Sequence, residues 1–333
     1  MSDIRTVYVS GYTDGKSEGI YKYEFDSNTG QLSQCRLAAE PCKHPSYFAL
    51  DPTKQRLYAV NEVVEYEGEN TGYVSAYERR ENGSLSLIGQ QPSGGEHPCY
   101  AVLDRKSQWL LVANYTGGNV ASMPLEPTLG KPRVSRHDKK ETGAVSARQE
   151  KPHAHSIDFH PSDDTWAFSM DLGCDVAVTY RLDNQTGTLT PNSTFAFPDG
   201  TGPRHLVFSP IDSSVAYVVG ELSNMIFGLK FSNGEFTEIQ RIDGLPQDFE
   251  GENLASEIDI TPNGKFLYAS MRGHDSIAIY RIDKESGRLT LVDRPSSGGE
   301  HPRHFTIDPS GQYLLVGNMV RMFLVTCENT FNN

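Results

Sequence analysis

Several histidines, arginines and carboxylates stand at matching positions of a segment that repeats along this chain. The third and fourth positions of that segment hold, in three of its copies, His155, Arg204 with His205, and Arg303 with His304. A second column, at the end of the apolar run that follows each copy, holds Glu62, Asp171, Glu221 and Arg272. Imidazole and carboxylate groups transfer protons, and guanidinium groups bind anions. The combination predicts a site that binds an anion and moves a proton.

The repeated segment is nine residues long and indicates how these side chains are positioned. Each copy is followed by a short turn, an apolar run, a third run, a hairpin turn and a more polar fourth run, which predicts four antiparallel strands per repeat. Repeats of this kind are typical of a β-propeller, in which the first strand of every blade lines a central channel. The six copies are His44–Pro52, His97–Arg105, His153–Pro161, Gly202–Pro210, Leu254–Pro262 and His301–Pro309.

The two ends of the chain fix the expected number of blades. Before the first copy the sequence has three strand-like runs, Thr6–Tyr12, Gly19–Phe25 and Gln31–Ala38, which begin at the second strand position. Six full starts and one partial start predict an all-β, seven-bladed propeller in a single domain, residues 1–333. The final stretch, Gly317–Asn333, has room for a third strand at Met322–Thr326 but not for an outer and a closing strand. We therefore expect the last blade and the ring closure to be incomplete.

Composition narrows the classes of partner and compartment. With 30 Lys and Arg against 43 Asp and Glu, the net charge is −13, which disfavours a general nucleic-acid or anionic-membrane surface. No apolar run of membrane-spanning length and no signal peptide is evident, so we expect a soluble cytoplasmic protein. The five cysteines show no CxxC spacing, as expected for reduced thiols. The polar stretch Pro124–Pro152 is expected to be a long connection.

Structural interpretations compete with the functional ones at several of these positions. A histidine at the first pattern position occurs four times and is expected to brace strand starts. His153 and His155 have a spacing compatible with zinc, but no third ligand is obvious, and we predict no metal site. Glu221 and Arg272 could form an ion pair between blades, and one of the two Arg-His pairs could be structural. No phosphate loop, dinucleotide fingerprint or nucleophile elbow occurs, so covalent catalysis has no support.

Four segments carry a resemblance to a known family: His153–Ser156, Gly200–His205, Glu221–Asn224 and Met271–Arg272. On these residues the chain resembles the seven-bladed propeller lactonases, which include bacterial 6-phosphogluconolactonase and fungal carboxy-cis,cis-muconate cyclase. The resemblance covers the chain to about Asn318. It implies a site at one mouth of the channel, and its implied residues are His155, Glu221, Arg204 and Arg272, with His205 also matching.

The resemblance implies hydrolysis of a sugar lactone, with 6-phosphoglucono-δ-lactone as the first candidate and without any cofactor. His155 or Glu221 would activate water, while Arg204 and Arg272 would hold the anionic group or the developing oxyanion. Further substrate contacts are expected from His205, Arg303, His304, Asp171 and Glu62. Two alternatives stay open: a cycloisomerase that forms a muconolactone in the same basic pocket, and a non-catalytic propeller that serves as a binding platform.

Overall fold

The chain forms two compact units, which are described separately. Unit 1 comprises Met1–Cys174 and Val178–Asn192, and unit 2 comprises Asp175–Ala177 and Ser193–Asn333. The computed structural model describes residues 4–51, 53, 55–137, 143–320 and 324–328. All 26 regular elements within these ranges are β-strands, arranged in seven antiparallel sheets. None of the described elements is a helix long and apolar enough to cross a membrane.

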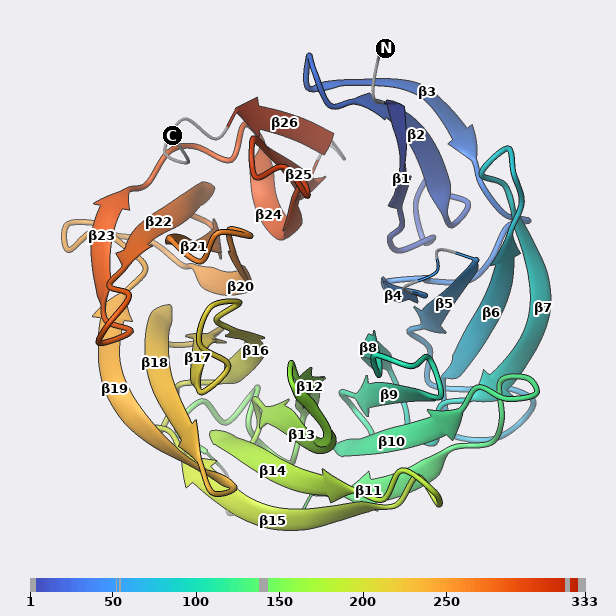
Figure 1. The fold of residues 1–333 in the computed structure, drawn as a ribbon, viewed down its shortest axis with the longest axis horizontal. Coiled ribbons are helices and arrows are strands. Elements are labelled where there is room, and N and C mark those ends of the chain that lie inside the picture. Colours follow the sequence, from blue (N-terminus) through green and yellow to red (C-terminus); the bar gives the residue numbers. More distant parts are fainter. Residues whose placement is uncertain (1–3, 52, 54, 138–142, 321–323, 329–333) are drawn as a thin grey trace. The chain divides into compact units, whose positions relative to one another are not determined.

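Unit 1 carries the first three sheets and most of the fourth (Figure 1). The first sheet has three strands and the others have four, and in each sheet consecutive strands pair as neighbours. The strands are β1 (Ile4–Val9), β2 (Tyr21–Asp26), β3 (Gln31–Leu37); β4 (Tyr47–Leu50), β5 (Arg56–Asn61), β6 (Tyr73–Arg79), β7 (Leu85–Pro92); β8 (Pro98–Leu103), β9 (Trp109–Asn114), β10 (Asn119–Pro124), β11 (Arg133–Arg136); β12 (Ala154–His160), β13 (Asp163–Asp171), β14 (Val176–Leu182) and β15 (Leu189–Ala196).

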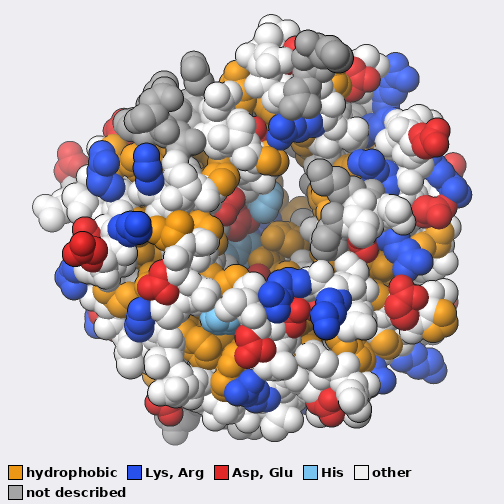
Figure 2. Space-filling view, in the orientation of Figure 1, with side chains coloured by type: hydrophobic (Ala, Val, Ile, Leu, Met, Phe, Trp, Pro, Cys, Tyr) orange, Lys and Arg blue, Asp and Glu red, His pale blue; other side chains and the backbone are white. Residues whose placement is uncertain are grey.

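Unit 2 carries the remaining three sheets, two of four strands and one of three within the described residues. Its strands are β16 (Pro203–Phe208), β17 (Val215–Gly220), β18 (Met225–Ser232), β19 (Glu235–Asp243); β20 (Leu254–Ile260), β21 (Phe266–Arg272), β22 (Ser276–Ile282), β23 (Leu289–Asp293); β24 (Glu300–Ile307), β25 (Tyr313–Val320) and β26 (Leu324–Glu328). On the face shown in Figure 2, basic and acidic side chains are intermixed.

The second strand of each four-stranded sheet is mostly buried, because neighbouring sheets pack against its faces. Every residue of β17 and of β21 is buried, for example. In unit 2, Tyr217 and Val219 of one sheet pack against Ile258 and Leu267 of the next, within one hydrophobic cluster. Burial of this apolar surface holds consecutive sheets face to face.

The first strands of consecutive sheets lie side by side in each unit. In unit 1, β4 contacts β8 and β8 contacts β12; in unit 2, β16 contacts β20 and β20 contacts β24. This arrangement is that of propeller blades, with the first strands innermost. It brings the third and fourth positions of the repeated segment close together within each unit.

The structure confirms most of the predicted elements. All six repeated segments form the first strand of a sheet, and among the residues that the structure describes the N-terminal sheet has three strands, beginning at the second strand position as predicted. Within the described residues the last sheet has three strands, and its third strand, Leu324–Glu328, falls close to the predicted position. The expected long connection is partly wrong, because Arg133–Arg136 within it pairs with β10 as the outer strand of its sheet.

Candidate functional site

The third position of the repeated segment is a β-bulge in five sheets. The pairing of the first and second strands shifts register around His155, Arg204 and Arg303. The same shift occurs around Cys99 in β8 and around Ser256 and Glu257 in β20. A bulge adds one residue to a strand and redirects its side chain, and bulges are frequent beside active sites. The side chains at these positions therefore point in a direction that they could not take on a regular strand.

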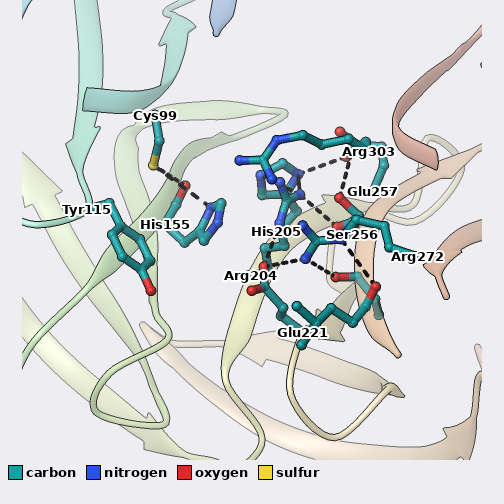
Figure 3. Close-up of polar contacts among 12 residues, drawn as sticks. Cys99, Tyr115, His155, Arg204, His205, Glu221, Ser256, Glu257, Arg272 and Arg303 are labelled. Atoms are coloured by element: carbon teal, nitrogen blue, oxygen red, sulfur yellow. Dashed lines mark hydrogen bonds and ion pairs between the residues drawn. The ribbon is translucent and has the colours of Figure 1, made fainter. Parts of the chain in front are cut away.

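Glu221 lies at the centre of a buried cluster in unit 2 (Figure 3). Its Oε2 accepts a hydrogen bond from Arg204 Nε at 3.0 Å and lies 2.9 Å from Arg272 Nη2. The three residues are 2 to 5 % exposed. The backbone of Glu221 is held as well, because its N–H donates to Gly202 O and its carbonyl accepts from Ala255 N. One carboxylate thus fixes two guanidinium groups from neighbouring sheets.

Backbone carbonyls complete the positioning of the two arginines. Arg204 Nη1 donates to Ser256 O at 2.8 Å, and Arg272 donates from Nε to Leu254 O and from Nη2 to Ala255 O. Each guanidinium keeps one terminal nitrogen, Arg204 Nη2 and Arg272 Nη1, without a hydrogen bond to the part of the chain that the structure describes. The arrangement therefore leaves two oriented terminal nitrogens, one on each arginine, that can donate to a ligand.

Arg272 is a cation in unfavourable surroundings. Burial, together with the charges of Arg204 and Arg303, lowers the pKa of Arg272 to about 10 against the opposing effect of Glu221. The side chain nevertheless stays protonated at neutral pH. Arg303, from β24, lies beside this cluster and is only half-buried (Figure 3). A buried cation with incomplete compensation favours binding of an anion.

A second carboxylate, Glu257, extends the cluster. Its Oε1 lies 2.9 Å from His205 Nδ1, and its Oε2 contacts His304 Nδ1. Burial opposes ionisation of Glu257, but the two histidines outweigh it and hold its pKa well below the usual range. Burial and the charge of Arg204 lower the pKa of His205 to about 4, so that its imidazole is neutral at pH 7. His205 and Glu257 are buried, whereas the side chain of His304 is 52 % exposed.

Acidification should therefore lower stability through His205. Between pH 6.5 and pH 4 the unfolded chain takes up a proton on this residue and the native protein does not, at a cost on the order of 3 kcal/mol by pH 4. Asp259 acts in the opposite direction, because burial raises its pKa to about 6 and the native protein keeps a proton that the unfolded chain loses. We predict that Asp259→Asn makes the fall in unfolding free energy steeper below pH 6. Urea unfolding at several pH values measures this, and equal slopes in both proteins would contradict it.

His155 lies in unit 1, at the bulge of β12, and is 5 % exposed. Its Nδ1 is 3.9 Å from Cys99 Sγ, and its ring meets the ring of Tyr115 edge-on at 5.4 Å (Figure 3). His153 stacks on the same tyrosine, with the two ring centroids 4.4 Å apart, and it hydrogen-bonds Tyr115 O and Glu150. No described group of three or more His, Cys, Asp or Glu side chains is placed to hold a metal ion.

Two expected substrate contacts have structural partners in unit 1. Asp171 is fully buried: Oδ1 accepts from the N–H groups of His153 and Cys174, and Oδ2 lies 2.5 Å from His137 Nδ1. It therefore braces a turn, and we leave it out of the proposed site. Glu62 accepts a hydrogen bond from the Tyr12 hydroxyl at 2.9 Å.

Two of the four histidines at the first pattern position contact a threonine of another segment, in agreement with the structural role predicted for them. His44 Nδ1 accepts from Thr13 N, and His97 Nδ1 hydrogen-bonds Thr116 Oγ1. Glu221 and Arg272 do form an ion pair, which was the alternative structural interpretation of these two residues. The sequence did not predict that Glu257 would connect His205 and His304, although this residue stands at the fourth position of the pattern, which was otherwise informative. An acid there, next to two Arg-His pairs in the neighbouring copies, was the available signal.

Repeated four-stranded antiparallel blades with charged groups on their innermost strands define a β-propeller with a polar site. The family model described as "Lactonase, 7-bladed beta-propeller" matches residues 6–321, which is most of the chain. The chain therefore belongs to this lactonase family.

Curated relatives and solved structures agree with that membership. The chain is 37 % identical over 315 residues to a 6-phosphogluconolactonase of Bacillus subtilis (strain 168), covering 93 % of this chain and 87 % of the relative. It is 32 % identical over 323 residues to a 6-phosphogluconolactonase of Formosa agariphila, covering 94 % and 89 %. A periplasmic gluconolactonase of Pseudomonas aeruginosa superposes with a TM-score of 0.89 at 30 % identity, over 98 % of this chain and 92 % of that one.

Proposed function

We propose that this protein hydrolyses a sugar lactone. The observation that carries the proposal is the pair Arg204 and Arg272, each fixed by Glu221 and by backbone carbonyls, with one N–H-bearing nitrogen left on each. Attack of water on a lactone carbonyl builds negative charge on its oxygen. Cations that are already oriented stabilise this charge without reorganisation at the moment of reaction. The names of the relatives support the same reaction class.

The substrate that we place first is 6-phosphoglucono-δ-lactone. Arg303 and His304 are the more exposed basic residues of the cluster, and we assign the phosphate of the substrate to them. Relatives named for both the phosphorylated and the unphosphorylated lactone make the two compounds the informative comparison. We expect a higher kcat/KM for 6-phosphoglucono-δ-lactone than for glucono-δ-lactone, measured above the spontaneous rate of opening. Equal values for the two compounds would remove the phosphate assignment while leaving lactone hydrolysis in place.

We assign activation of water to His155, one of the two candidate bases that the sequence left open. The alternative base is Glu221. Its Oε2 contacts the guanidinium groups of Arg204 and Arg272, so this carboxylate is better suited to hold the two arginines than to accept a proton from water. An imidazole has its ordinary pKa near neutral pH and suits a general base. A cytoplasmic location remains part of the proposal. The Pseudomonas aeruginosa relative is described as periplasmic, so cell fractionation is the direct test.

A further inference from the structure

A cavity of about 390 Å³ lies in unit 1 and is lined mainly by the loops between strands. Its volume falls within the range of small-molecule sites in proteins. The walls come from the connections that follow β5, β7 and β9, from the end of β11 and from the residues just before β12. None of the residues that the proposed function uses is among those that line it. The cavity is therefore a feature of the fold that the reaction leaves unexplained.

Contacts between these loops hold the walls of the cavity in place. Gly117 N–H donates to Glu96 O at 3.0 Å, and His137 N–H donates to Gly118 O at 3.2 Å. Gly118 has a φ of 58°, and a Cβ at this position would lie 2.7 Å from Pro152 O, so the two loops touch through their backbones. Loops joined in this way form the cavity before a ligand arrives, as is usual for small-molecule sites.

The cations of the cavity come from a basic segment of an acidic protein. Residues 124–152 contain seven Lys and Arg against four Asp and Glu, a net charge of +3, whereas the whole chain carries −13. Two of these cations, Arg136 and Lys151, line the cavity, and Glu96 is an acidic residue in its wall. An anionic ligand therefore meets local positive charge here, although the protein as a whole repels it.

His137 contributes a buried polar atom without a partner. Its side chain is 2 % exposed, and Nδ1 lies 2.5 Å from Asp171 Oδ2. The other ring nitrogen, Nε2, is buried and has no hydrogen-bond partner in the part of the chain that the structure describes. Such atoms are rare in native proteins, where an ordered water, an ion or a similar group often explains them. Since His137 lines the cavity, this atom is a second sign, separate from the charges, that a polar molecule belongs there.

We propose that this cavity is a binding site for a small phosphorylated sugar. Arg136 and Lys151 bind the phosphate, because cationic side chains make strong charge-assisted hydrogen bonds to phosphate oxygens. The side chains of Glu96 and Asn70 offer acceptor oxygens to sugar hydroxyls. The carboxylate of Glu96 repels a bare phosphate, so a ligand that also carries hydroxyl groups suits this wall better than inorganic phosphate. Binding here does not depend on the proposed lactone hydrolysis.

The test is a titration of histidine-labelled protein with glucose 6-phosphate at pH 7.5 and constant ionic strength, followed by NMR of the histidine rings. We expect the signal of His137 to shift and to saturate. Loss of one cation, in Arg136→Gln or in Lys151→Gln, should weaken this binding about 10-fold or more. The matched control is Lys131→Gln, which replaces an exposed lysine of the same segment that is not among the residues lining the cavity. This variant should bind as the wild-type protein does.

The signal of His137 is assigned by its absence in His137→Gln. If that variant does not fold, the contact of this ring with Tyr180, whose ring centroid is 6.2 Å away, assigns it instead. A response of His304 reports phosphate at the proposed reaction site and so distinguishes the two places.

A His137 signal that stays unchanged throughout the titration would overturn the proposal, whatever His304 does. Equal binding by Arg136→Gln, Lys151→Gln and Lys131→Gln would overturn it as well. Inorganic phosphate is the second probe, and we expect it to bind about 10-fold or more weakly because it lacks the hydroxyl groups. Equal affinity for the two probes would remove the sugar from the proposal.

Discussion

Replacing Glu221 by Gln should lower kcat/KM for the lactone by about 10²-fold or more. The amide keeps the size of the side chain but removes the negative charge that Arg204 and Arg272 share. The two guanidinium groups would then repel each other and leave the orientation that the reaction requires. Loss of one donor to a developing oxyanion typically costs 10²- to 10³-fold, and this substitution disturbs two.

The same substitution should also destabilise the protein, by about 3–5 kcal/mol, because it leaves buried cations without their counter-ion. Urea unfolding at pH 7.5 measures this effect, and Glu300→Gln provides the same chemical change at an exposed position of β24. If Glu221→Gln matched Glu300→Gln in both turnover and unfolding free energy, the carboxylate would have neither role. If only stability fell, Glu221 would be a structural ion pair, as one interpretation of the sequence holds.

Arg272→Lys should reduce kcat by about 10²-fold or more, although the positive charge is retained. The guanidinium reaches Leu254 O, Ala255 O and Glu221 at the same time, and it still has Nη1 available. A lysine ammonium is a single point of charge and cannot make these contacts from one position. The variant should therefore keep the ion pair with Glu221 and lose the N–H group that faces the ligand.

Kinetics of Arg272→Lys beside Arg281→Lys measure this difference. Arg281 is exposed on the neighbouring strand β22, so its replacement controls for the general effect of the exchange. A large fall in kcat that is confined to Arg272→Lys is the expected result. Activity near wild type in Arg272→Lys would transfer the role of binding the oxyanion to another group, with Arg204 the next to test.

The repeat made most of the fold predictable. A period of about fifty residues and the alternation of apolar runs with turns are properties of the backbone arrangement, and they do not depend on any single side chain. The comparison of repeats also selected Arg204, Glu221 and Arg272, because departures from a shared scaffold pattern mark positions that the scaffold does not explain. These three residues form one cluster in unit 2.

Asp171 and Glu221 show where the comparison of repeats stops being informative. Both stand in the same column, but the shorter side chain of Asp171 folds back and accepts from Cys174 N, three residues further on. Asp side chains commonly bond to their own turn in this way, whereas the longer Glu221 extends to the two arginines. The column alone could not distinguish these outcomes, since it gives the position of a side chain and not its direction.

The β-bulges at the third pattern position could not be predicted from the sequence either. Their register shifts appear only when the two strands are paired, and they redirect His155, Arg204 and Arg303. The bridge that Glu257 makes between His205 and His304 is similar, because it joins three strands that are separate in the chain. Contacts of this kind follow from packing between sheets rather than from local pattern.

The most direct test of the central claim is the rate at which the purified protein hydrolyses freshly generated 6-phosphoglucono-δ-lactone, after subtraction of spontaneous opening, with Glu221→Gln measured in parallel. The account predicts rapid turnover by the wild-type protein and a loss of about 10²-fold or more in the variant. The account would be contradicted if a folded wild-type protein did not accelerate the opening of either this lactone or glucono-δ-lactone above the spontaneous rate.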